Sequence, residues 1–147
     1  MSDTAGPETG GATGTGGGQG PYVLDASALM CLINGEPGAE RVAAVLSQAV
    51  ISTVNLAEVA TKLNDLGADA ATARALLAPL HLAVAPFDEA GAYATGALRA
   101  ATRGQGLSLG DRSCLALAAS RKATVLTTDK AWATVGDLVG VAVEMLR

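Results

Sequence analysis

The chain has 147 residues, half of them apolar and 16% charged, which indicates one globular domain with a core of its own. It contains no apolar run of the roughly 20 residues that cross a bilayer, and its start lacks the features of a secretory signal, so we expect a cytoplasmic protein without a membrane partner. A net charge of −4 gives no sign of a basic surface for nucleic acid. It does not exclude a phosphate substrate, because bound cations would offset clustered acids.

Residues 1–20 are predicted to be a disordered tail and residues 21–147 to form the folded domain. The tail is rich in glycine and almost free of apolar side chains, so it cannot bury enough surface to offset its ordering entropy. The two cysteines, Cys31 and Cys114, lie in apolar, helix-like stretches, and we expect buried free thiols there rather than zinc ligands.

Short apolar runs alternate with amphipathic stretches along the folded part of the chain. The sequence predicts strands at 22–24, 49–52, 81–85, 124–129 and 139–145. It predicts helices at 27–34, 37–47, 53–66, 69–78 and 88–103, another with Asp111 in or near its first turn, and a short one from Lys130. This alternation indicates an α/β fold, a parallel sheet built from βαα repeats with helices on both faces.

Four acids recur where these elements join. Asp25 and Asp129 directly follow predicted strands, Asp111 begins a helix, and Glu58 lies early in another helix on a largely apolar face. Any one aspartate at such a place is explained as a helix cap. In a parallel sheet, however, all of these joints lie at the carboxyl edge, so we expect the four carboxylates to converge there.

Clustered carboxylates repel one another unless a cation binds between them. Their hard oxygen ligands favour Mg²⁺ or Mn²⁺, and such an ion can activate water for displacement at phosphorus. The sequence offers no Ser/His/Asp arrangement and no glycine-rich phosphate loop of the Walker type. Metal-dependent phosphodiester hydrolysis is therefore the chemistry that the residues favour.

The chain resembles the PIN-domain ribonucleases, specifically the VapC-type toxins of type II (VapBC) toxin–antitoxin pairs. The resemblance runs from Tyr22 to about Val143 and is carried by four motifs: Val-Leu-Asp25-Ala-Ser-Ala, Asn55-Leu-Ala-Glu58-Val, Leu-Ser-Leu-Gly-Asp111-Arg-Ser-Cys-Leu-Ala-Leu-Ala and Val-Leu-Thr-Thr-Asp129-Lys-Ala-Trp132. It implies a PIN-like fold and an endoribonuclease that cleaves RNA. The resemblance also implies that the four acids are catalytic and hold one or two Mg²⁺ or Mn²⁺ ions.

The same resemblance assigns supporting roles to four further residues and predicts partners. Ser27 and Thr127 would give polar support near the carboxylates, and Arg112 and Lys130 would contact RNA phosphates. A homodimer and a cognate VapB-type antitoxin are implied, with the apolar helices at 27–34 and 38–47 as candidate contact surfaces.

Three other functions remain open at this point. A phosphatase of the haloacid-dehalogenase type would carry Asp-x-Asp after the first strand, whereas Ala26 and Ser27 follow Asp25. A non-catalytic PIN-like interaction module would commonly lack one or more of the four acids. A receiver-like phosphoacceptor domain would need an acidic pair near the first strand and a lysine at the end of a late strand.

Overall fold

A computed structural model of the protein describes residues 22–147, so the predicted disordered tail lies outside the described residues. Five strands form one sheet in the order β4-β3-β2-β5-β6, and every neighbouring pair is parallel. The fold is therefore the predicted parallel α/β type. The strands are β2 (Tyr22–Leu24), β3 (Ala49–Ser52), β4 (Ala83–Ala85), β5 (Thr124–Thr127) and β6 (Val143–Met145).

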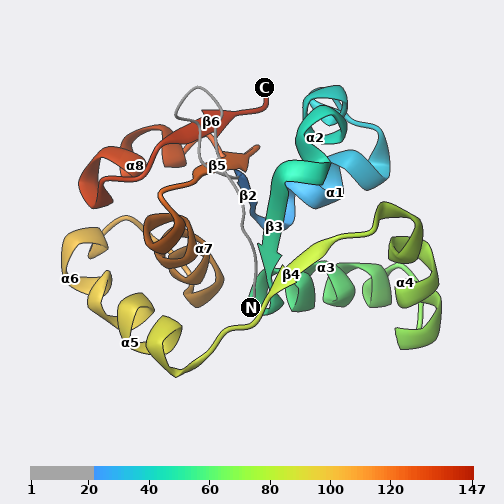
Figure 1. The fold of residues 1–147 in the computed structure, drawn as a ribbon, viewed down its shortest axis with the longest axis horizontal. Coiled ribbons are helices and arrows are strands. Elements are labelled where there is room, and N and C mark those ends of the chain that lie inside the picture. Colours follow the sequence, from blue (N-terminus) through green and yellow to red (C-terminus); the bar gives the residue numbers. More distant parts are fainter. Residues whose placement is uncertain (1–21) are drawn as a thin grey trace.

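Helices cover both faces of the sheet (Figure 1). One face carries α1 (Ala26–Asn34), α2 (Ala39–Val45), α3 (Thr53–Asp65) and α4 (Ala70–Leu77), with the 3-10 turns η2 (Leu46–Gln48) and η3 (Ala78–Leu80). On the other side lie α5 (Glu89–Ala97), α6 (Arg99–Thr102), α7 (Leu109–Arg121) and α8 (Trp132–Val139). Within residues 22–147, no helix has the length and apolar composition needed to cross a bilayer.

The central strands are buried on both faces because their side chains alternate between two apolar clusters. Leu24 and Ile51 point into the cluster formed with α1 to α4. Val23 and Val125 point into the cluster formed with α7 and α8, which also contains Cys114. Both cysteines are buried free thiols, as predicted.

The long helix predicted at 88–103 is divided at Leu98 into α5 and α6. The Leu98 amide donates to the carbonyl of Thr95, three residues back, at 3.3 Å, which is the tighter bonding of a 3-10 turn. Gly96 lies just before this break, and glycine is costly inside a helix. The sequence pattern predicted one continuous helix here, but the residues around Gly96 have too little helix propensity to keep it unbroken.

Three of the predicted strands are shorter than expected. Leu80 ends η3 and His81 takes a left-handed conformation with φ 49°, so β4 begins only at Ala83. Strand β5 ends at Thr127 rather than at Asp129, because the next residues form the turn into α8. The predicted strand at 139–145 is wrong at its start, since α8 continues to Val139 and Gly140 caps it at φ 71°.

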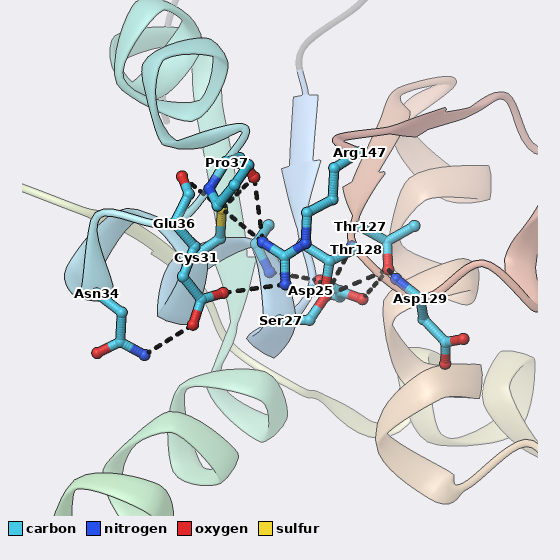
Figure 2. Close-up of polar contacts among 11 residues, drawn as sticks. Asp25, Ser27, Cys31, Asn34, Glu36, Pro37, Thr127, Thr128, Asp129 and Arg147 are labelled. Carbon is cyan, nitrogen blue, oxygen red and sulfur yellow. Dashed lines mark hydrogen bonds and ion pairs between the residues drawn. The ribbon is translucent and has the colours of Figure 1, made fainter.

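The residues after β6 contact the end of β5 and the turn between α1 and α2. The Leu146 amide donates to the carbonyl of Thr127 at 2.9 Å, which continues the β5–β6 ladder. Arg147 forms an ion pair with Glu36 at 3.0 Å and donates to the carbonyl of Pro37 (Figure 2). Gly38, with φ 104°, sits so close to Leu146 that an added Cβ would lie 2.8 Å from its carbonyl oxygen.

Candidate active site

Asp25 lies at the carboxyl end of the central strand β2, where it caps α1. The side chain is buried, with the residue 6% exposed, and its Oδ1 accepts hydrogen bonds from the Ala28 amide at 2.8 Å and from Ser27 Oγ at 2.7 Å. Its Oδ2 accepts from Thr127 Oγ1 at 2.5 Å, as Figure 2 shows. Two donors in the first turn of α1 and one at the end of β5 therefore fix both carboxylate oxygens.

Burial raises the pKa of Asp25 above its ordinary value. The hydrogen bonds from Thr127, Ser27 and the Ala28 amide act in the opposite direction, because they stabilise the charged form, and the charge of Asp111 raises the pKa further. The Asp25 carboxylate is thus a desolvated group that gains from a nearby cation.

The turn after β5 extends the same network toward Asp129. Thr127 Oγ1 accepts from the Asp129 amide at 3.0 Å, and Ser27 Oγ accepts from the Thr128 amide at 3.0 Å. The Asp129 side chain is exposed and accepts from the Ala131 amide at 3.0 Å. The Thr127 hydroxyl consequently links the Asp129 amide to the Asp25 carboxylate, while the Asp129 carboxylate faces the start of α8.

Glu58 is held by a buried neighbour on α3. Asn55, which is 1% exposed, donates from Nδ2 to Glu58 Oε1 at 2.7 Å and to the carbonyl of Gly110 at 3.2 Å. Asn55 Oδ1 accepts from Ser52 Oγ at 3.1 Å. These contacts bring α3 against the first turn of α7, where Asp111 lies.

Gly110 allows this close approach because it has no side chain. A Cβ at this position would lie 2.3 Å from Glu58 Oε2 and 2.7 Å from Glu58 Cδ, which is much closer than atoms can pack. The carboxylate of Glu58 thus rests directly on the backbone of α7. The conformation of Gly110 itself is ordinary for a helix, so the glycine is needed here for space.

Asp111 forms a capping box at the start of α7. Its Oδ2 accepts from the Ser108 amide at 3.0 Å, and its own amide donates to Ser108 Oγ at 3.1 Å. The side chain therefore satisfies the helix end. Its charge also contributes to the raised pKa of Asp25.

Cys114 is buried in α7, one helical turn after Asp111. Burial raises the pKa of its thiol well above the usual value, and the charges of Asp25, Asp111 and Glu58 raise it further. Asp25 follows β2 and Asp129 follows the neighbouring strand β5, so both lie at the carboxyl edge of the sheet. The two ion pairs formed within residues 22–147 lie elsewhere, and neither uses any of these acids.

The donor set fits a hard cation such as Mg²⁺ or Mn²⁺, since the only charged ligands that gather here are carboxylates. Among residues 22–147, no three His, Cys, Asp or Glu side chains are arranged to hold a metal ion as they stand. Their present directions follow from the hydrogen bonds described above: Asp111 turns back to Ser108 and Glu58 is held by Asn55.

The two predicted RNA-contacting cations differ in their surroundings. Arg112 is partly buried and donates from one terminal nitrogen to the carbonyl of Thr95 at 3.2 Å, so it ties α7 to α5. Lys130 is exposed beside Asp129. Lys130 is the more exposed of the two, and an RNA contact for either residue stays a prediction.

Two residues that contact Glu58 were part of the sequence motifs but had no predicted role. Asn55 precedes Glu58 by three positions and therefore shares its helix face, which was the available signal. Gly110 directly precedes Asp111, and nothing in the sequence indicated that a side chain from another helix would occupy its space.

Comparisons with known proteins identify the fold. DNA-bound VapBC from Salmonella typhimurium superposes with a TM-score of 0.65 at 21% identity, covering 86% of this chain and 98% of the other. FitAcB from Neisseria gonorrhoeae superposes with a TM-score of 0.63 at 23% identity, covering 85% of this chain and 97% of the other. Mycobacterium tuberculosis VapC20, described as a sarcin-ricin loop cleaving toxin, superposes with a TM-score of 0.65 at 18% identity, covering 78% of this chain and 95% of the other. At these identities the likeness is one of fold.

No curated protein sequence matches the chain. The PIN domain family model matches residues 22–138, which include all four acids and all of the sheet except β6. The chain therefore belongs to the PIN domain family, as its motifs predicted.

Proposed function

We propose that this protein is a Mg²⁺- or Mn²⁺-dependent endoribonuclease that acts as the toxin of a VapBC-type toxin–antitoxin pair. The observation that carries the proposal is the placement of Asp25 at the carboxyl end of β2 in a PIN-domain sheet, together with the Asn55 amide that joins Glu58 to the residue before Asp111. None of these three acids has a Lys or Arg partner among residues 22–147, so a bound cation would balance their charge.

In this proposal Asp25, Glu58, Asp111 and Asp129 hold the cation, and Asp25 has the most fixed position of the four. A bound ion would supply a water of lowered pKa and positive charge at the phosphate oxygens. Ser27 and Thr127 hold the Asp25 carboxylate in place, and Thr127 also sets the turn that carries Asp129.

RNA as the substrate is supported by the fold shared with VapC20, whose description names cleavage of the sarcin-ricin loop. Lys130, exposed next to Asp129, is the side chain that we propose to contact a substrate phosphate. For Arg112 the bond from one terminal nitrogen to the Thr95 carbonyl favours a structural role.

An antitoxin of the VapB type and a homodimer complete the proposal. The VapBC complexes with the same fold support the antitoxin partner. An apolar groove of about 700 Å³ between α3, α4 and the edge strand β4 supports protein binding, since it is lined by Leu56, Ala73, Leu77 and Val84. Light scattering during gel filtration tests the dimer, and inhibition of cleavage by a co-expressed VapB-type protein tests the antitoxin.

The direct test is cleavage of a structured RNA pool by the purified protein with Mg²⁺, with Mn²⁺ and with EDTA. The variants Asp25→Asn and Asp111→Asn remove the charges but keep the shapes, and Asn can still accept the helix-capping bonds. Asp137→Asn on the exposed surface of α8 is the matched control.

We expect metal-dependent cutting by the native chain and by Asp137→Asn. The two site variants should lose more activity than the roughly 10- to 100-fold typical of removing an outer-shell partner of a metal ligand. If the folded native chain neither cuts RNA nor takes up Mn²⁺ in calorimetry, the nuclease proposal is wrong. The non-catalytic PIN-like interaction module is then the better description.

A further inference from the structure

We infer that Asn55 is the positioning residue for Glu58: its amide holds the Glu58 carboxylate against α7 and thereby sets the metal affinity of the site. This inference rests on the proposed metal-dependent function, and it gives a role to a residue that the sequence motifs contained without one. Asn55 itself touches neither metal nor substrate in this proposal. It acts through Glu58.

The hydrogen bonds of Asn55 leave its side chain only one orientation. Both Nδ2 donors are used, toward Glu58 Oε1 at 2.7 Å and the carbonyl of Gly110 at 3.2 Å, while Oδ1 accepts from Ser52 Oγ at 3.1 Å. Turning the amide over would put its oxygen against a carboxylate and a carbonyl, both of which only accept. Because Asn55 is 1% exposed, water cannot replace the lost bonds cheaply.

The contact matters because a glutamate has several rotatable bonds and loses their entropy when it binds a metal. A donor that already holds one carboxylate oxygen reduces that loss, which is the usual effect of a partner behind a metal ligand. Within residues 22–147 the hydrogen bond from Asn55 is made to Oε1, and no other side chain or backbone amide bonds the Glu58 carboxylate.

The second bond of the same amide links Glu58 to the neighbouring acid. The carbonyl of Gly110 belongs to the residue just before Asp111, so one Asn55 side chain fixes the distance between α3 and the first turn of α7. Ser113 Oγ donates to the same carbonyl at 2.9 Å without contacting Glu58. Ser113 thus offers a control that changes the same backbone group and leaves Glu58 alone.

A double-mutant cycle on Mn²⁺ binding, measured by isothermal titration calorimetry, separates positioning from general damage to the fold. The four proteins are the native chain, Asn55→Leu, Glu58→Ala and the double variant, with Ser113→Ala as control. We expect Asn55→Leu to weaken Mn²⁺ binding by about 10- to 100-fold in the native background. In the Glu58→Ala background the same change should add no more than about twofold, because Asn55 then has no ligand left to position.

The thermal unfolding of each variant shows whether it is folded, and Asn55→Ser replaces Asn55→Leu if the leucine variant does not fold. Ser113→Ala should bind Mn²⁺ within about twofold of the native chain. Equal losses from the Asn55 change in both backgrounds, or no loss in either, overturn the inference. If the native chain itself binds no Mn²⁺, it is the proposed metal-dependent function that is wrong. Failure of the proposed function is thereby distinguished from failure of the inference about Asn55.

Discussion

Thr127 donates a 2.5 Å hydrogen bond to Asp25, 102 residues away in the chain. The bond joins the carboxyl ends of β2 and β5, which are neighbours at the centre of the sheet. It is made by a residue without exposed surface to a carboxylate that is itself buried. The bond that orients the Asp25 carboxylate also joins two central strands at their carboxyl ends. Changes to this bond therefore alter both the stability of the fold and binding at the site.

The stability of the fold should depend on the charge of Asp25. Burial raises the pKa of Asp25 above its ordinary 3.8, so between 3.8 and the higher folded value the folded chain binds a proton that the unfolded chain has lost. The stability from this group is thus greatest below that window, falls as the pH rises through it, and stays low above it. Asp25→Asn removes this loss, so we expect a higher melting temperature than for the native chain at neutral pH.

Thermal unfolding from about pH 4 to about pH 8 tests the effect, and the advantage of Asp25→Asn should shrink toward the acid end. Asp137→Asn, on the exposed surface of α8, should show no such trend. An advantage of constant size at every pH would mean that the charge of Asp25 is not its cause.

Replacing Thr127 by valine should destabilise the protein, because valine has nearly the same shape but cannot donate to Asp25 or accept from the Asp129 amide. Loss of a hydrogen bond to a charged group costs about 1.5–3 kcal/mol. Thr127→Ser keeps the hydroxyl and should lose only about 1 kcal/mol for the buried methyl group. Urea unfolding at neutral pH measures both, and equal losses for the two variants would show that packing dominates.

Gly110→Ala should weaken metal binding without a comparable loss of stability. The new Cβ would lie 2.3 Å from Glu58 Oε2, so the flexible Glu58 side chain must turn away from Asn55. Alanine in a helix gains up to about 1 kcal/mol over glycine, which offsets the rearrangement. We expect Mn²⁺ binding to weaken by about tenfold or more.

The combination with Glu58→Ala checks the cause. Once the carboxylate is gone, alanine at position 110 has room, so the unfolding free energy of the double variant should exceed that of Glu58→Ala by about 0.5–1 kcal/mol. Native-like Mn²⁺ binding by Gly110→Ala would contradict the close packing seen here.

Gly38→Ala should be among the more damaging changes outside the site. Gly38 has φ 104°, and an added Cβ would meet the carbonyl oxygen of Leu146 at 2.8 Å, where the backbone cannot move freely. Gly35 also has a positive φ, 62°, but nothing lies within 4 Å of its Cβ position. We expect Gly35→Ala to cost about 1–2 kcal/mol and Gly38→Ala clearly more, measured by urea unfolding.

The sequence was sufficient to predict the parallel sheet and the location of the acids, because both depend on patterns within short stretches. Asp25 follows an apolar run, and that alone places it at the carboxyl edge. The directions of the side chains were not predictable in the same way. Asp111 turns to Ser108, and Glu58 rests on Gly110 from a helix about fifty residues away. Such contacts depend on how helices meet, which no local pattern encodes.

The break at Leu98 and the late start of β4 were missed for a different reason. Helix and strand propensities differ by only about 1 kcal/mol per residue, so a few weak formers such as Gly96 decide where an element ends. Because α5 contains both Gly91 and Gly96, its sequence did not show at which of them the helix would end.

The pairing of β2 with β5 also determines when, during synthesis of the chain, the site can form. Asp25 is among the first residues of the domain to be synthesised, and the hydroxyl that completes its surroundings comes 102 residues later. A growing chain that has reached only α7 holds Asp25, Glu58 and Asp111 but has no β5 to set beside β2. On the proposed function, the surroundings of Asp25 are therefore incomplete until β5 has been synthesised and has paired with β2.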